Sequence, residues 1–521
     1  MSSQQERRNK RLVSQMRHTP QSEFKLVRAF IALGFAICMC ACSEDSPASA
    51  SDGPTGLNLL LVVADDLNWD SVGAYGCEVP DITPNIDRLA SEGMRFEHAH
   101  VTVAVCQPSR HVLLTGRYPH RSGGEGFYKL RIPGVPILPG VLREAGYRVG
   151  ALGKLAHSTP YADFEWDYIA RRKELGMGRN PELFAKSATE FFEQSREAGK
   201  PFFLMVNSHD PHRPFFGDDP DEWYDSTAHP AVPPSTEYDP VDCAVPAFLP
   251  ELAAVAVDVT SYYNSVRRFD DTLGAVLEAL KASQLEDDTV VVFLSDNGMS
   301  FPFAKASCYL NSTRTPWIVR WPGRVTAGSV CSDEMISAID LMPTLLEVAG
   351  IQDPGGMDGR SIIELLDGSS QADRDFVFTQ FGQSASGDSF PTRCIQSRNH
   401  GYMFNPWSDG IRSFTRLETS ASRTFLALTR ASNKSRIQAD RLEFLLKRTP
   451  EELYDFDKDP GAMDNRIDDP ALTSTLDSLR EELESWMVRF NDPALNAFRM
   501  RNSSEVVDGF VSEMDSYGGE K

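Results

Sequence analysis

Residues 101–120 read VTVAVCQPSRHVLLTGRYPH, and the rest of the chain is organised around them. Pro108 suits the first turn of a helix, where its missing N–H costs nothing. The stretch predicts a short helix over 109–115. Cys106 is therefore expected just ahead of a helix N-terminus, where free N–H groups and the helix dipole favour an anion. Arg110 is expected to face back toward position 106.

The amino-terminal segment predicts export. A positively charged start is followed by the apolar run Phe30–Ala41, which has signal-peptide length and is too short to span a bilayer. We expect a leader over 1–42 and a polar linker over 43–56. The end of the apolar run loosely resembles a bacterial lipobox with Cys42 as the lipidated residue. Lipidation and simple secretion both stay open, so the expected location is periplasmic, secreted or outer-membrane in a bacterium.

Composition and charge limit the class of protein. The 521 residues can bury a large core, and 41% hydrophobic and 24% charged residues are ordinary for a globular protein. The net charge is −22. This acidity argues against nucleic acid as a partner, and it requires any anion site to be a local basic pocket. The cysteines after the leader show no zinc-like spacing, and the sequence does not indicate which of them would form disulfide bonds.

Four apolar runs end in polar residues that could form one site. Such runs predict buried strands of a mostly parallel sheet, which binds ligands at the carboxyl ends of its strands. The runs are 57–64 before Asp65 and Asp66, 147–152 before Lys154 and His157, 201–207 before His209 and His212, and 289–294 before Asp296 and Asn297.

The aspartates and the asparagine of these strand ends favour a metal. Asp65 and Asp66 would be costly at a buried strand end unless a cation binds them. With the oxygens of Asp296 and Asn297 they make a set that suits Ca²⁺. Each motif alone also has a structural alternative, because a capped turn would explain the first pair and a simple turn the second. Cys106 alone could likewise be a small buried hydrophobe.

The motifs and their order resemble the type I, formylglycine-dependent sulfatases over roughly residues 55–490. The matching segments are Cys106–Arg110 with LTGR at 114–117, TPNIDRLA at 83–90, HDPHRPF at 209–215, SDNG at 295–298 and ELYD at 452–455. The resemblance implies an α/β, alkaline-phosphatase-like sandwich with a large mixed, mostly parallel sheet. This catalytic domain is expected over 57–374, and a smaller C-terminal subdomain with an antiparallel sheet over 375–499. Residues 500–521 are expected to be an acidic, frayed tail.

The resemblance also implies a reaction. Cys106 would be oxidised to formylglycine by a maturation enzyme, and its hydrate would attack sulfur to give a covalent sulfo-enzyme. The residues implied to hold one Ca²⁺ are Asp65, Asp66, the modified Cys106, Asp296 and Asn297. The residues implied to bind sulfate or protonate the leaving group are Arg110, Lys154, His157, His209 and Lys305. His212 and Arg393 are expected to contact the substrate, although His212 could instead be structural.

The expected substrate is a sulfated glycan. The segments 295–309 and 391–398 resemble heparan N-sulfatases, which implies removal of the N-sulfate of glucosamine in heparin or heparan sulfate. The spacing Gly153-Lys154-x-x-His157 resembles iduronate 2-sulfatases instead, so an exo-acting O-sulfatase on another sulfated polysaccharide is the alternative. Two further alternatives are a phosphonate or phosphate monoester hydrolase and a non-catalytic glycan-binding lipoprotein. The last predicts an unconverted thiol at Cys106. The sequence does not set an oligomeric state.

Overall fold

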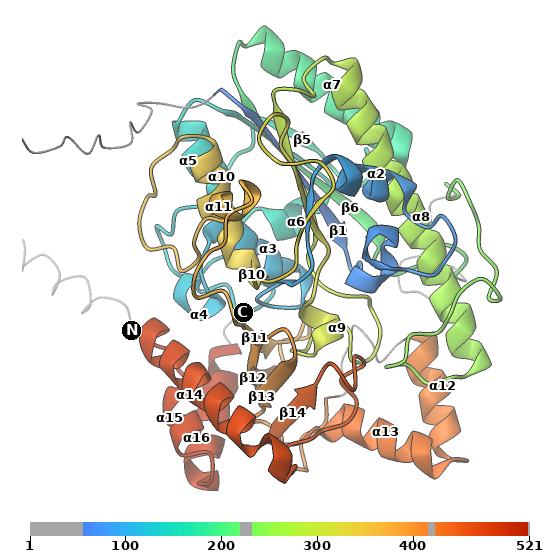
Figure 1. Ribbon diagram of the computed structural model, residues 1–521, viewed down its shortest axis with the longest axis vertical. Coiled ribbons are helices and arrows are strands. Elements are labelled where there is room, and N and C mark those ends of the chain that lie inside the picture. Colours follow the sequence, from blue (N-terminus) through green and yellow to red (C-terminus); the bar gives the residue numbers. More distant parts are fainter. Residues whose placement is uncertain (1–55, 219–231, 415–421, 519–521) are drawn as a thin grey trace, which may run out of the picture. The chain divides into compact units, whose positions relative to one another are not determined.

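The computed structural model describes residues 56–218, 232–414 and 422–518 (Figure 1). The predicted leader, nearly all of the linker and the candidate lipid anchor Cys42 lie outside these ranges. All the described residues belong to one unit. Within them, no helix combines the length and the apolar character needed to cross a membrane.

An eight-stranded sheet forms the centre of this unit, in the order β5-β4-β6-β1-β7-β8-β2-β9. The strands from β5 to β7 run parallel, β8 is antiparallel to both neighbours, and β2 is parallel to β9. The mixed, mostly parallel sheet is therefore confirmed. The strands are β1 (Asn58–Asp65), β2 (Met94–Phe96), β4 (Arg148–Leu152), β5 (Tyr168–Ala170), β6 (Phe202–Pro211), β7 (Thr289–Ser295), β8 (Trp317–Arg320) and β9 (Ser329–Cys331).

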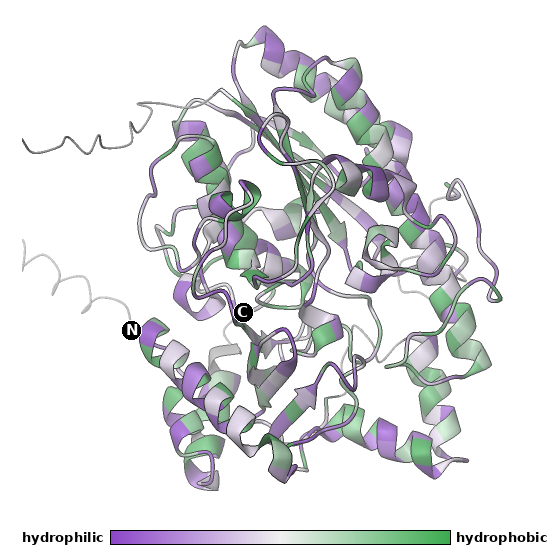
Figure 2. Cartoon of the chain, in the orientation of Figure 1, coloured by the Kyte–Doolittle hydropathy of each residue, from purple (hydrophilic) through white to green (hydrophobic). Residues whose placement is uncertain are grey.

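The central strands form where the sequence has continuous apolar runs. Every residue of β1 and β7 is buried, as expected for strands covered on both faces. Leu60 of β1 pairs with Leu204 of β6 and with Val291 of β7, so the three strands end at the same edge. Figure 2 shows these apolar strands between helices on which hydrophilic and hydrophobic residues alternate.

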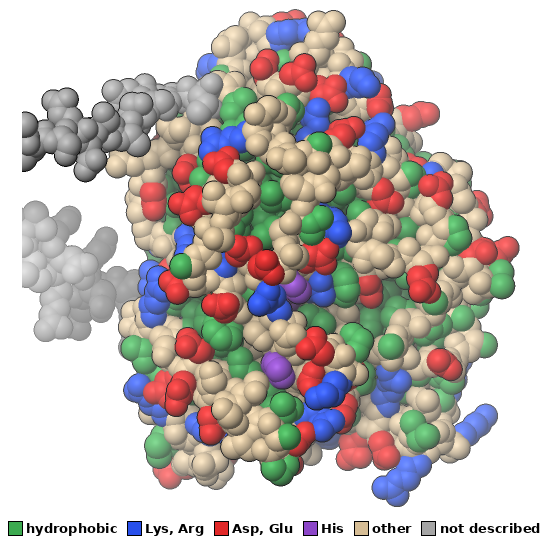
Figure 3. All heavy atoms as spheres, viewed as in Figure 1, with side chains coloured by type: hydrophobic (Ala, Val, Ile, Leu, Met, Phe, Trp, Pro, Cys, Tyr) green, Lys and Arg blue, Asp and Glu red, His purple; other side chains and the backbone are tan. Residues whose placement is uncertain are grey.

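Helices cover both faces of the sheet (Figure 1). One layer contains α2, α7 and α8, and the other contains α3, α5, α6 and α10. On the face in Figure 3, acidic and basic side chains are intermixed, and apolar side chains show in the hollows between them. The helices are α2 (Pro84–Glu92), α3 (Cys106–Thr115), α4 (Pro119–Ser122), α5 (Leu138–Glu144), α6 (Leu155–Ser158), α7 (Pro181–Glu197), α8 (Ala253–Ala282), α9 (Leu310–Thr313), α10 (Leu341–Val348) and α11 (Ile363–Leu366).

Helix α3 begins earlier than predicted. It starts at Cys106, with Val105 as its N-cap, and ends at Gly116 in the left-handed conformation (φ 61°). Cys106 is therefore the first residue of the helix and does not lie ahead of it. Pro108 still falls in the first turn, where N–H groups have no partner within the helix, so its ring is tolerated.

The carboxyl-terminal part contains the expected small antiparallel sheet, in the order β11-β12-β13-β14. Helices α14 and α16 pack against β12. Residues 500–521 are not simply frayed, because Ser504–Gly518 form α16 and bury Phe510 and Val511. The remaining elements are β3 (Ala99–His100), β10 (Ile336–Ser337), β11 (Val377–Gln383), β12 (Ser389–Gln396), β13 (His400–Phe404), β14 (Glu451–Asp455), α12 (Arg423–Ser432), α13 (Arg436–Lys447), α14 (Thr473–Phe490), α15 (Leu495–Arg499) and α16.

Candidate active site

The carboxyl end of β1 carries the two predicted aspartates into a buried site. Asp65 and Asp66 are both fully buried, and Asp66 has a left-handed backbone conformation (φ 72°). The Asp66 N–H donates a hydrogen bond to Asp296 Oδ1 at 3.2 Å. A non-glycine residue in this conformation persists only where its surroundings enforce it, commonly at functional sites. The adjacent ends of β1 and β7 therefore bring the two predicted strand ends together.

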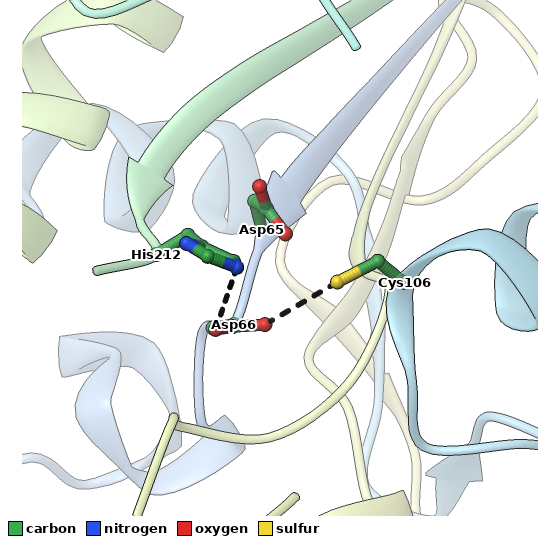
Figure 4. Close-up of side chains that lie close together, drawn as sticks. All are labelled: Asp65, Asp66, Cys106 and His212. Atoms are coloured by element: carbon green, nitrogen blue, oxygen red, sulfur yellow. Dashed lines mark hydrogen bonds and ion pairs between the residues drawn. The ribbon is translucent and has the colours of Figure 1, made fainter. Parts of the chain in front are cut away.

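Four side chains at this edge place their metal-ligating atoms within 4.8 Å of one another: Asp65, Asp66, Cys106 and His212 (Figure 4). Asn297 lies beside them and donates from Nδ2 to Asp66 Oδ1 at 2.7 Å. Among the described residues, Asp65 Oδ1 and Asn297 Oδ1 are buried and accept no hydrogen bond. Carboxylate and amide oxygens without donors are the ligands that a hard cation such as Ca²⁺ takes. The donor set fits the divalent ion that the family resemblance implies.

Two buried lysines face the aspartates. The Nζ of Lys305 lies 2.6 and 2.7 Å from the carboxylate oxygens of Asp66 and 3.5 Å from the Sγ of Cys106. Lys154 forms an ion pair with Asp65. Burial raises the pKa of Asp65, but Lys154 and other nearby cations outweigh it, so the net pKa lies well below its ordinary value. Lysines and carboxylates therefore balance one another's charge here.

Arg110 ties α3 to the ends of β6 and β7. The side chain is fully buried, and its Nε donates to Asp296 Oδ2 at 2.8 Å. Its Nη1 donates to Asn207 Oδ1 at the end of the run 201–207. Burial raises the pKa of Asp296 to about 6, although Arg110 lowers it. Asn207 was not predicted, and its only signal in the sequence is that an amide ends a buried apolar run.

The histidines of β6 and α6 are neutral. Burial, followed by the charge of Lys154, lowers the pKa of His157 to about 2 and that of His209 well below its usual value. The Nδ1 atom of each has no hydrogen-bond partner among the described residues. A Cβ atom at Gly178 would lie 2.1 Å from His209 Nδ1, so only glycine lets the backbone approach this ring. The Nδ1 of His209 therefore packs against Gly178, and a ligand would reach this ring through Nε2.

An ion network behind the segment 209–214 could not be predicted. Asp210 accepts hydrogen bonds from Arg268 Nε at 2.7 Å, from Arg268 Nη2 at 2.9 Å and from Arg179 Nη1 at 3.0 Å. All three side chains are buried. A buried aspartate in a strand requires a cation, but the sequence does not say which of its arginines supplies it. The network fixes the strand end that carries His209 and His212.

Arg393 is held apart from these residues. It lies on β12, is 1% exposed and donates from Nε to Asp492 Oδ2 at 2.6 Å. This ion pair balances its charge, and its Nη2 is buried without a hydrogen-bond partner among the described residues. The substrate contact expected of Arg393 therefore stays a prediction, whereas the other predicted side chains come together at one edge of the sheet.

Comparison with known proteins agrees with this arrangement. The profile of the family described as Sulfatase matches residues 57–351. Human N-sulphoglucosamine sulphohydrolase is 30% identical over 469 residues, which is 84% of this chain and 91% of that protein. An ulvan-active sulfatase of Formosa agariphila is 28% identical over 462 residues, covering 86% and 85%. A solved structure of a protein in complex with its substrate, D-glucosamine-2-N,6-O-disulfate, has the same fold, with a TM-score of 0.62 and 18% identity over 84% of this chain and 99% of that one. The chain belongs to the sulfatase family.

Proposed function

We propose that this chain is a formylglycine-dependent sulfatase that removes the N-sulfate of glucosamine in heparin or heparan sulfate. The observation that carries the proposal is the position of Cys106. It is the first residue of α3 and lies among Asp65, Asp66 and Lys305. The choice of N-sulfate is supported by the extent of the likeness to the human N-sulphoglucosamine sulphohydrolase, which includes 91% of that protein.

Modification of Cys106 is needed because the thiol itself is a poor nucleophile here. Burial raises the pKa of Cys106 far above its ordinary value, so very little thiolate forms near neutral pH. Oxidation of Cys106 by a maturation enzyme would give formylglycine, whose hydrate carries two hydroxyl groups on one carbon. One hydroxyl can attack sulfur, and the other lets the aldehyde reform as sulfate leaves.

The metal site is supported by the cluster of acidic and amide oxygens, two of which, Asp65 Oδ1 and Asn297 Oδ1, are buried without a donor among the described residues. Asp65, Asp66, Asp296, Asn297 and the modified residue 106 would hold one Ca²⁺. When bound, the ion supplies positive charge that stabilises anionic oxygens of the sulfate group. The positively charged side chains of the site would stabilise the same anionic oxygens.

The remaining residues bind the sulfate and handle the proton. Lys305 and Lys154 present ammonium groups at the edge that carries Cys106, and Arg110 keeps the helix start in place through Asp296. Neutral imidazoles donate one N–H and accept at the other nitrogen, so His157 and His209 can orient the leaving amine. An imidazole that the anionic substrate has brought to its protonated form would give that amine its proton.

A panel of sulfated sugars tests the substrate. We expect sulfate release from glucosamine N-sulfate and little from 2-O- or 6-O-sulfated disaccharides that lack an N-sulfate. Release only from an O-sulfated sugar would keep the mechanism and support the exo-acting O-sulfatase, which the Lys154-x-x-His157 spacing favours.

We also propose export through the predicted leader. Amino-terminal sequencing of the mature protein tests this proposal.

A further inference from the structure

A small cavity lies beside the segment that carries Lys305. It has a volume of about 20 Å³ and is lined by residues that follow Lys305, by strands β11 to β13, and by Arg448 just after α13. This volume holds about one water-sized group, so the terminal oxygens of a sulfate or a carboxylate can enter it and a sugar ring cannot. Any occupant is therefore a substituent of a larger ligand or a small ion.

Arg448 brings an uncompensated charge to this cavity. It is 9% exposed, and among the residues that the structure describes its Nη1 is buried without a hydrogen-bond partner and its guanidinium forms no ion pair. The guanidinium carbon lies 4.6 Å from the ring centroid of Tyr309 and 4.9 Å from that of Phe303. Aromatic faces stabilise a cation but offer no acceptor to its N–H groups. A buried cation without an acceptor is costly, which indicates a missing anion.

The nearby acid does not serve as that anion. Glu452 is fully buried, and its oxygens accept hydrogen bonds from the hydroxyls of Tyr309 and Tyr454 at 2.7 Å and from Asn405 Nδ2 at 2.8 Å. These three donors occupy the carboxylate. Arg448 therefore lines the cavity while its guanidinium has no acidic partner among the described residues.

The cavity is linked to the catalytic cluster through a strained segment. Phe303 and Ala306, on either side of Lys305, both have left-handed backbone conformations (φ 66° and 57°), as does Arg448 (φ 58°). The Ala306 N–H donates to Ala104 O at 2.9 Å, two residues before Cys106. The same few residues therefore present Lys305 to Cys106 and Ala306 to the cavity. Strain of this kind persists where the surrounding structure enforces it.

We infer that Arg448 binds a second anionic substituent of the substrate, an oxyanion carried by the same saccharide as the sulfate at Cys106. The inference rests on the proposed function and adds a specificity-determining residue to it. The oxyanion is either a second sulfate or the carboxylate of a neighbouring uronate, and both would accept hydrogen bonds from the guanidinium. Substrates with the second anion are preferred over those without it.

Binding to a catalytically inert variant tests the inference. Dissociation constants are measured on Cys106→Ala for glucosamine N-sulfate, for its 6-O-sulfated form and for a disaccharide that adds a glucuronate. We expect one of the two added anions to tighten binding about 10- to 100-fold, as a hydrogen bond to a charged group does. In Cys106→Ala with Arg448→Met this gain disappears, and binding of glucosamine N-sulfate changes less than about threefold. The added anion that tightens binding, the sulfate or the carboxylate, is the one that Arg448 binds.

Two further variants separate charge recognition from folding. Arg448→Lys keeps the positive charge and should keep part of the gain in affinity. This variant tests the inference if Arg448→Met does not fold. Arg430→Met removes an exposed arginine from α12 and should change nothing. A gain that persists without Arg448, or no gain from either anion, overturns the inference. Failure of the proposed function shows separately, as no sulfate release by the matured wild-type protein.

Discussion

Replacing Asp210 with asparagine should destabilise the protein more than any comparable surface change. Asp210 is fully buried and accepts three hydrogen bonds from the guanidinium groups of Arg179 and Arg268, which are also buried. Burial already lowers the pKa of Arg179 to about 10, and Asp210 opposes this shift. Asparagine keeps an oxygen acceptor but removes the charge, so two buried cations lose their counter-ion.

The expected loss is large because the remaining charges stay buried. Removing one partner of a buried ion pair costs about 3–5 kcal/mol of the free energy of unfolding. The rate should fall as well, because Asp210 lies between His209 and His212 on the strand end that enters the active site. We expect kcat/KM for the sulfated substrate to decrease together with stability.

A matched exposed pair provides the control. Arg324 and Asp367 make a similar two-pronged ion pair, at 2.6 and 2.7 Å, but both side chains are about 40% exposed. Asp367→Asn should cost less than about 1 kcal/mol. Urea unfolding followed by tryptophan fluorescence compares both variants with the wild type. If Asp210→Asn lowers the free energy of unfolding no more than Asp367→Asn does, burial does not make the loss of the Asp210 charge more costly than the loss of an exposed charge.

Three other predictions concern the active site and its helix. Lys305→Met should lower kcat/KM by about 100-fold or more, since it removes a positioned donor, while Lys305→Arg retains part of the rate; equal rates in steady-state assays would contradict this. Burial lowers the pKa of His111 to about 3, so its stabilising effect is present above the unfolded pKa of about 6.5 and is lost as the pH falls toward 3. Urea unfolding should show that the wild type loses about 2 kcal/mol more than His111→Leu between pH 7.5 and pH 5, and parallel losses would disprove the assignment. Ca²⁺ added to chelator-treated protein should raise Tm, and Asp65→Asn should abolish the shift; a wild-type Tm that does not respond would argue against the metal site.

Much of the fold is predictable because its central strands are continuous apolar runs. Runs such as 57–64 and 289–294 can only be buried on both faces, and their polar endings then fall at one edge of the sheet. The start of α3 is less predictable, since Pro108 suits any position of the first turn and therefore does not fix which residue begins the helix.

The parts that sequence reasoning missed depend on pairings between distant residues. Arg268 contacts Asp210 from α8, 58 positions away, and no local pattern indicates this partner. The ion pair of Arg393 with Asp492, which lies beyond α14, likewise joins residues far apart in the sequence, and the substrate contact of Arg393 stays a prediction. Helix α16 was missed although its apolar residues Val506, Val507, Phe510, Val511 and Met514 recur at the spacing of an amphipathic helix.

The central claim is that the residue at position 106 reacts as an aldehyde hydrate. Mass spectrometry of the peptide that contains Cys106, from protein made in its native host, tests it most directly when sulfate release is measured on the same sample. We predict an aldehyde at position 106 and turnover of glucosamine N-sulfate. Full turnover by protein that retains an unmodified thiol at this position would contradict the account.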